Sequence, residues 1–180
     1  MKRICAIIAA MLCFSGYVLA QDVPKAEIFG GYSYAHAGTN LDNSLNMNGW
    51  NVAVTGNINS WLGVVVDVAQ HFGSTSSPDL DHELRSFMIG PQFAIRRHEK
   101  ITPFFRGMIG DARIGQSSGD RRIYHENCFS MILGGGIDIG VHPVVAIRVI
   151  QADYQMTMFS NDTQNDVRLS FGVVFRLGEK

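Results

Sequence analysis

The segment 167–177 alternates between apolar residues and polar or small ones with almost no exception. Every odd-numbered position in it is apolar: Val167, Leu169, Phe171, Val173, Phe175 and Leu177. The even-numbered positions include Arg168 and Arg176. Because successive side chains of a strand point to opposite faces, the segment is predicted to be a strand with one apolar face and one face that carries two arginines. In a membrane-spanning barrel, the apolar face of such a strand contacts lipid and the arginines lie inside.

The first twenty residues have the features of a secretory signal peptide. Lys2 and Arg3 provide a positive start, Ile4–Phe14 is apolar, and small residues end the segment at Ala20. The apolar run is shorter than the ~20 residues that a membrane-spanning helix needs. We therefore expect residues 1–20 to be a signal peptide, and residues 21–180 to form one mature domain that begins at Gln21.

The composition of the mature chain excludes several classes of protein. Without Lys2 and Arg3 it has 13 basic and 16 acidic residues, which is not the charge of a nucleic-acid-binding domain. Cys128 is the single cysteine after the predicted leader, so no intrachain disulfide can form. No later apolar run reaches the length of a spanning helix, so a mature chain that crosses a membrane must cross it as strands.

Seven further segments are predicted to be strands, most of them by a similar alternation. They are residues 26–35, 49–58, 62–72, 83–95, 102–114, 129–141 and 144–156. The last is ambiguous by its period alone, and Pro91 is expected to mark a bulge or a local break in the fourth strand. The predicted fold class is all-β: an eight-stranded antiparallel up-and-down transmembrane β-barrel.

The predicted connections alternate in length along the chain. Residues 59–61, 96–100 and 142–143 are short, whereas residues 36–47, 73–82, 115–127 and 157–165 are long and polar. Short turns at one end and long loops at the other are typical of outer-membrane barrels, which carry the turns in the periplasm. Aromatic residues near several predicted strand ends fit an interfacial girdle.

The chain resembles the small OmpA-type eight-stranded outer-membrane β-barrels. The resemblance rests on residues 29–34 (FGGYSY), 134–138 (GGGID), 152–154 (ADY) and 168–176 (RLSFGVVFR). It implies a monomer in the bacterial outer membrane, in contact with membrane lipid and lipopolysaccharide, inserted by the barrel-assembly machinery. One departure is that the chain continues past Phe175 to Lys180 instead of ending on an aromatic residue.

Charged residues occupy many of the alternate strand positions that are predicted to face the barrel interior. They are Glu27, Asp67, Arg106, Asp138, Arg148, Arg168 and Arg176. A charge that faces lipid at mid-bilayer costs roughly 2–4 kcal/mol, so these residues are expected to lie inside the barrel. Asp138 and Arg148 are equidistant from Pro143 and should lie opposite one another. Barrel closure should bring Glu27 to Arg176.

These charges allow two interpretations. They could form an ion-pair gate on a narrow pore, or a packed polar core whose charges offset one another's burial. The interior of an eight-stranded barrel is just wide enough for side chains to fill it, which favours the packed core.

Short matches to catalytic and cofactor-binding motifs occur in the sequence, but they lack the structural context that these motifs require. Residues 115–119 (GQSSG) match the pattern of a nucleophile elbow, but no helix is expected after them. Residues 134–136 (GGG) lack the spacing of a dinucleotide-binding loop, and the six histidines form no close pair with metal-ligand spacing. No His-x-Ser-Asn signature of lipid A deacylases occurs. We therefore expect no catalytic residues, no cofactor and no metal.

The sequence predicts a non-enzymatic integral outer-membrane protein with a structural or surface-interaction role. Three alternatives stay open at this point: a narrow solute pore, a soluble lipocalin-like barrel that binds an apolar ligand, and a lipid-modifying barrel enzyme. The soluble barrel requires the reverse sidedness, with the apolar parity inside and the arginines in water.

Overall fold

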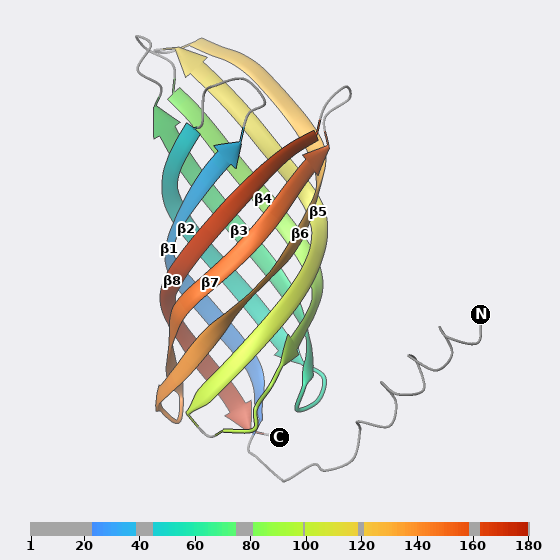
Figure 1. Cartoon of the computed structure of the whole chain (residues 1–180), viewed down its shortest axis with the longest axis vertical. Coiled ribbons are helices and arrows are strands. Elements are labelled where there is room, and N and C mark those ends of the chain that lie inside the picture. Colours follow the sequence, from blue (N-terminus) through green and yellow to red (C-terminus); the bar gives the residue numbers. More distant parts are fainter. Residues whose placement is uncertain are drawn as a thin grey trace, which may run out of the picture.

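A computed structural model describes residues 23–38, 45–74, 81–98, 100–118, 121–158 and 163–179. It contains eight strands: β1 (Pro24–Gly38), β2 (Leu45–Asn57), β3 (Leu62–Ser74), β4 (Asp81–Ala94), β5 (Ile101–Ser118), β6 (Arg121–His142), β7 (Val145–Met158) and β8 (Thr163–Glu179). Each strand pairs antiparallel with the next, and β8 pairs with β1 to close the barrel (Figure 1). The predicted fold class is confirmed. The described residues include no helix with the length and apolar character to span a membrane.

The barrel has two different ends. The connections between β2 and β3, β4 and β5, and β6 and β7 lie at the same end as the carboxyl end of β8, which we call the turn end (Figure 1). Strands β1, β3, β5 and β7 end at the opposite side of the barrel, which we call the loop end. The connections that follow these four strands contain the residues 39–44, 75–80, 119–120 and 159–162, which lie outside the described residues.

The strands extend further toward the loop end than their alternation predicts. Residues 115–127 were expected to form a long loop, yet β5 continues to Ser118 and β6 begins at Arg121. The expected loop 157–165 is likewise shortened, since β7 reaches Met158 and β8 starts at Thr163. The physical reason is that ladder hydrogen bonds do not depend on side-chain polarity. Alternation marks the part of each strand that faces lipid, and the polar part beyond it pairs equally well.

Pro91 produces a local break and not a bulge. It pairs with Val64 on β3, but the β4–β5 pairing passes from Ile89 with Ile109 to Gln92 with Arg106 without a change of register. Proline has no N–H to donate to the ladder, which accounts for a gap on one side only.

A β-bulge interrupts β7 and changes which residues face inward. Arg148 lies opposite Gly172, but Gln151 lies opposite Ser170, so the register shifts by one residue. Val149 and Ile150 are both exposed on the outer surface. The bulge explains why the alternation of this strand was ambiguous: it places both Arg148 and Gln151 in the interior although they differ in parity.

The sidedness of the barrel matches the prediction for a membrane protein. On β8, Leu169, Phe171 and Phe175 are 42%, 57% and 51% exposed, whereas Arg168, directly before Leu169, is 1% exposed. Large apolar residues cover the outer surface on all eight strands, far beyond the apolar patches that soluble monomers expose. This sidedness is the reverse of what a soluble ligand-binding barrel requires.

Apolar clusters fill the interior on both sides of its charged centre. One cluster consists of Phe29, Ala53, Val65, Met88, Met108, Ile132, Ala146 and Val174. A second, nearer the loop end, consists of Ala35, Met47, Leu84 and Ala112. The barrel interior is therefore a packed core in which charged and apolar layers alternate.

Candidate functional site: the interior charge network

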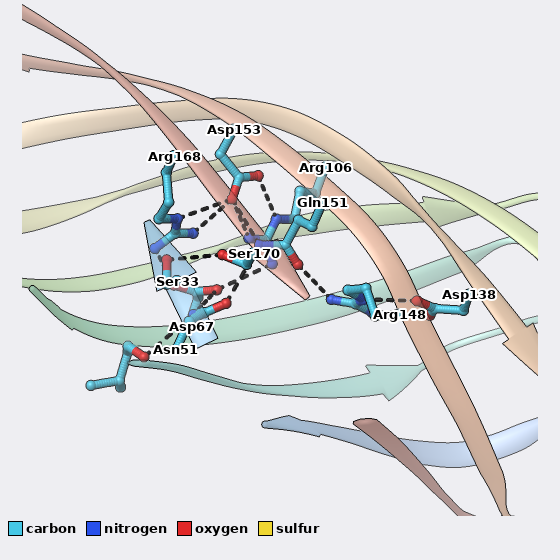
Figure 2. Close-up of polar contacts among 11 residues, drawn as sticks. Ser33, Asn51, Asp67, Arg106, Asp138, Arg148, Gln151, Asp153, Arg168 and Ser170 are labelled. Carbon is cyan, nitrogen blue, oxygen red and sulfur yellow. Dashed lines mark hydrogen bonds and ion pairs between the residues drawn. The ribbon is translucent and has the colours of Figure 1, made fainter. Parts of the chain in front are cut away.

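Four fully buried charges form the centre of the interior. Asp67 on β3, Arg106 on β5, Asp153 on β7 and Arg168 on β8 are each at most 1% exposed. Each arginine contacts both aspartates (Figure 2). Arg106 lies 3.1 Å from Asp67 and 2.8 Å from Asp153, and Arg168 lies 3.0 Å and 2.9 Å from the same two carboxylates. The two positive and two negative charges make a neutral square that joins strands far apart in the sequence.

Neutral polar groups complete the hydrogen bonding of the two aspartates. Asn51 donates its amide N–H to Asp67 Oδ2 at 2.8 Å, and Gln151 donates to Asp153 Oδ2 at 2.8 Å. A buried ion pair stabilises only when its geometry is good and further hydrogen bonds satisfy the remaining polar atoms. The square has the close contacts and most of the added hydrogen bonds, and Arg106 Nη1 has only its ion-pair contact with Asp67 at 3.1 Å.

A hydroxyl and imidazole chain lies beside the square. Ser33 on β1 and Ser170 on β8 have their hydroxyl oxygens 2.9 Å apart, and Ser33 Oγ lies 2.8 Å from His71 Nε2. All three side chains are at most 2% exposed. A serine beside a histidine could suggest nucleophilic catalysis, but Ser33 also contacts Ser170 and is closed to solvent. The chain therefore ties β1, β3 and β8 together.

The pair Asp138–Arg148 extends the network toward the turn end. Arg148 Nε and Nη2 donate to the two oxygens of Asp138 at 2.7 and 3.0 Å, and Nη1 donates to Gln151 Oε1 at 2.7 Å (Figure 2). The guanidinium carbon lies 4.4 Å from the ring centre of Phe29 and 4.1 Å from that of Phe104, within cation–π distance of both rings. Gln151 thus links this pair to the central square.

Glycines make room for these buried groups. A Cβ at Gly136 would lie 2.8 Å from Phe104 Cζ, and a Cβ at Gly134 would lie 2.0 Å from Asp153 Oδ1. The run 134–136 therefore serves close packing against an aromatic ring and a carboxylate, and not phosphate binding.

A third group of charges closes the turn end. Glu27 on β1 lies 3.7 Å from Arg176 Nε and 3.1 Å from Arg96 Nη2. Arg96 also donates to the backbone carbonyl of Ser60 at 2.8 Å and to Asn57 Oδ1 at 3.2 Å. Its guanidinium thereby connects the first two turns at this end to the start of β1.

The structure places all seven residues proposed from the sequence on the inner side of the barrel wall, where only Arg176 is partly exposed. It brings Asp67, Arg106 and Arg168 together at the centre. Asp138 pairs with Arg148, and Glu27 with Arg176.

Sequence reasoning missed Asp153 and Arg96. If β7 alternated regularly from Arg148 onward, Asp153 would share the outer face with Val149 and the other apolar residues. The bulge between Arg148 and Gln151 shifts the alternation by one residue and turns Asp153 inward. A carboxylate at a lipid-facing position is destabilising, so its presence there was a readable signal of the bulge. Arg96 was assigned to a turn, and no pattern indicated that its side chain reaches across to Glu27.

The arrangement favours rigidity over chemistry. Every carboxylate of the central square is held by both arginines, so neither is free to accept a proton from a substrate. The described ranges contain no group of three or more His, Cys, Asp or Glu residues placed to hold a metal ion. Residues 115–118 of the suspected nucleophile elbow lie in strand β5 and not in a strand-to-helix turn.

Comparisons with known proteins agree with this architecture. No curated protein matches the sequence. Among solved structures, neisserial surface protein A (NspA) aligns with a TM-score of 0.74 and 17% identity, over 85% of this chain and 97% of that one. Ail, the attachment invasion locus protein of Yersinia pestis, aligns with a TM-score of 0.59 and 21% identity, over 85% and 99%. OprG from Pseudomonas aeruginosa aligns with a TM-score of 0.60 and 10% identity, over 89% and 99%.

At these identities the structural neighbours show a shared fold. The family follows from the sequence itself, because the model of the outer membrane protein beta-barrel domain matches residues 6–175. With its closed eight-stranded barrel and apolar outer surface, the chain belongs to the outer membrane protein β-barrel domain family.

Proposed function

We propose that this protein is a non-enzymatic, monomeric barrel of the bacterial outer membrane with a structural and surface-interaction role. The observation that carries the proposal is the filled interior: interlocked ion pairs and apolar clusters occupy the space through which a solute would pass. Function is then left to the outer surface and to the loop end. The segments available for contacts outside the cell are residues 39–44, 75–80, 119–120 and 159–162.

The names of two structural neighbours support a surface role. One neighbour is a neisserial surface protein, and the other is an attachment and invasion protein. Ail has also been solved in complex with a heparin analogue. These properties belong to those proteins, and the shared barrel makes them a reasonable model for this chain.

Conductance in planar lipid bilayers separates a sealed barrel from a pore. We expect the purified full-length barrel to show no stable channel openings, because the central square and the Asp138–Arg148 pair block the interior. Stable openings in the wild type that widen in Arg148→Ala would replace the structural role with that of a gated pore.

Cell fractionation tests the location and the fold together. The protein is expected in the outer-membrane fraction, with a mobility in gels that shifts on boiling, as a closed barrel unfolds only when heated. Recovery in the soluble fraction without detergent would contradict the proposal.

Delivery to the outer membrane is proposed to depend on the amino-terminal leader. Cleavage after Ala20 would release a mature chain that starts at Gln21 and is inserted by the barrel-assembly machinery into a membrane of lipid and lipopolysaccharide. Amino-terminal sequencing of protein from the outer-membrane fraction checks this point. A protein that retains Met1 would show that residues 1–20 are not a cleaved leader.

Topology is tested with an epitope inserted in residues 39–44. If the loop end faces outward, antibody binds this epitope on intact cells, whereas the same epitope inserted after Lys100 at the turn end becomes accessible only after the outer membrane is permeabilised. The opposite pattern would invert the orientation and remove the basis for a surface role.

A further inference from the structure

Two arginines lie directly opposite one another on the outer surface of the barrel. Arg85 on β4 pairs in register with Arg113 on β5, and both side chains are exposed. Residues directly opposite in an antiparallel pair have Cβ atoms about 4.5–5.5 Å apart, and like charges in such a pair are destabilising. A cross-strand arginine pair therefore needs a source of negative charge.

The pair lies at the border of the apolar belt on the loop side. Going from the turn end, the large outward residues of β4 are apolar up to Phe87, and those of β5 are apolar up to Ile109. Tilted membrane strands need ~9–11 residues to cross the hydrocarbon, which is the length of these two apolar stretches. Arg85 is the next outward residue of β4, and on β5 Asp111 and then Arg113 follow Ile109, so both arginines lie beyond the length that the hydrocarbon needs and are expected at the level of the lipid headgroups.

The protein supplies only part of the required negative charge. Arg85 contacts Glu83 at 2.6 Å, and Glu83 also accepts a hydrogen bond from Gln70. Arg113 forms no ion pair with any residue that the structure describes, although the exposed Asp111 lies two positions away on the same face. One guanidinium of the pair is thus left for an anion from outside the chain.

We propose that Arg85 and Arg113 bind the phosphate of a phosphorylated glycolipid in the outer leaflet. This inference rests on the proposed outer-membrane location. Guanidinium groups match phosphate in geometry and form charge-assisted hydrogen bonds with it. The carboxylates of Glu83 and Asp111 provide acceptors for sugar hydroxyls on either side of the phosphate.

The surface below the arginines favours a lipid as the source of the phosphate. Phe87 is 54% exposed, Ile109 is 51% exposed and Phe129, which lies opposite Asp111 on β6, is 47% exposed. These residues are continuous with the apolar belt and offer a packing surface for acyl chains. A soluble phosphate or an anionic peptide would use the arginines but would leave this surface uncovered.

Retention of lipid by the refolded full-length protein in detergent tests the proposal. Native mass spectrometry would measure binding of bisphosphorylated lipid A, of dephosphorylated lipid A, and competition by inorganic phosphate. We expect wild type to retain bisphosphorylated lipid A and to bind the dephosphorylated form more weakly. The R85Q/R113Q variant should lose affinity by roughly tenfold for each arginine removed, the usual size of a lost charge-assisted contact.

The matched control removes two positive charges from the other end of the barrel. Arg97 and Lys100 are exposed at the turn end, so R97Q/K100Q changes the net charge equally without touching the proposed site. Its affinity for lipid A should equal that of wild type. The R85K/R113K variant should fall between wild type and R85Q/R113Q, because lysine keeps the charge but not the planar geometry.

Several results would overturn the proposal. Equal retention of lipid A by wild type and R85Q/R113Q would exclude the site, and so would equal loss in R97Q/K100Q. Full displacement by inorganic phosphate with no preference for the lipid would show a general anion site. The boiling-induced gel shift of every variant is recorded in parallel. A protein that shifts normally but ignores lipid A contradicts this inference alone, whereas the absence of a shift in wild type contradicts the proposed barrel function.

Discussion

At the scale of single residues, the structure shows why the barrel tolerates buried charges. Asp67 and Asp153 are each shared by two arginines, and amide donors occupy part of the remaining capacity of their carboxylates. The removal of one member leaves the three remaining buried charges out of balance, with two charges of one sign and only one of the other. Such a loss is more costly than the net stabilisation that the intact pair provides.

Asp153→Asn is expected to destabilise the barrel by about 3–5 kcal/mol, the usual cost of breaking a buried pair. Asparagine has the same shape but leaves Arg106 and Arg168 with Asp67 as their only carboxylate. Urea unfolding in lipid vesicles, followed by tryptophan fluorescence, measures the free energy. Asp111→Asn is the control, because Asp111 is exposed on the outer surface; the account is wrong if both variants lose the same stability.

Gly134→Ala is expected to destabilise the protein by about 1–3 kcal/mol, as overpacked cores do. The new Cβ would collide with Asp153 Oδ1 and with the carbonyl of Ala152. Gly30→Ala provides the comparison, because a Cβ at Gly30 meets no atom within 4 Å. Unfolding midpoints in urea distinguish the two, and a Gly134→Ala midpoint equal to that of Gly30→Ala would refute the close packing.

At the scale of elements, the bulge in β7 is the feature that assembles the network. Val149 is the extra residue: without it, Arg148 and Gln151 would be separated by one outward residue, and the alternation would be regular on both sides. A one-residue slip elsewhere in a strand turns every following side chain to the opposite face. The bulge is therefore the one position on β7 where a residue can be removed without changing which side chains face inward.

Deletion of Val149 is accordingly expected to leave a folded, heat-modifiable barrel. Deletion of Val173, an outward valine in the regular pairing of β8 with β1, should abolish folding, because it turns half of β8 inside out. The gel shift on boiling after refolding reports both outcomes. If the Val149 deletion fails to fold as completely as the Val173 deletion, the role assigned to the bulge is wrong.

The alternation predicted the existence and sidedness of the strands, as β8 shows most clearly. It predicted neither where β5 ends and β6 begins nor the place of Asp153. The ladder continues in polar sequence because backbone hydrogen bonds do not require apolar neighbours, so the pattern carries no information about those ends. The position of Asp153 depends on the register shift in β7. Such a shift changes which face of the strand a residue occupies, and the amino-acid composition of the strand does not reveal it.

At the scale of the whole molecule, the barrel reverses the sidedness of a soluble barrel. The outer surface is apolar around the full circumference, and the interior holds the ionic groups. Both tryptophans of the chain lie on the outer surface: Trp50 is 41% exposed and Trp61, stacked on Phe93, is 51% exposed. They report the environment of the outer face without any substitution.

Quenching of this native fluorescence tests the sidedness most directly. The barrel is refolded into vesicles of phosphatidylcholine with brominated acyl chains, and the emission is compared with that in unbrominated vesicles and in the presence of acrylamide. We expect strong quenching by the brominated lipid and weak quenching by acrylamide, because Trp50 and Trp61 on the outer face are in contact with lipid. Strong quenching by acrylamide with no effect of the brominated chains would place the apolar face away from lipid and contradict the account.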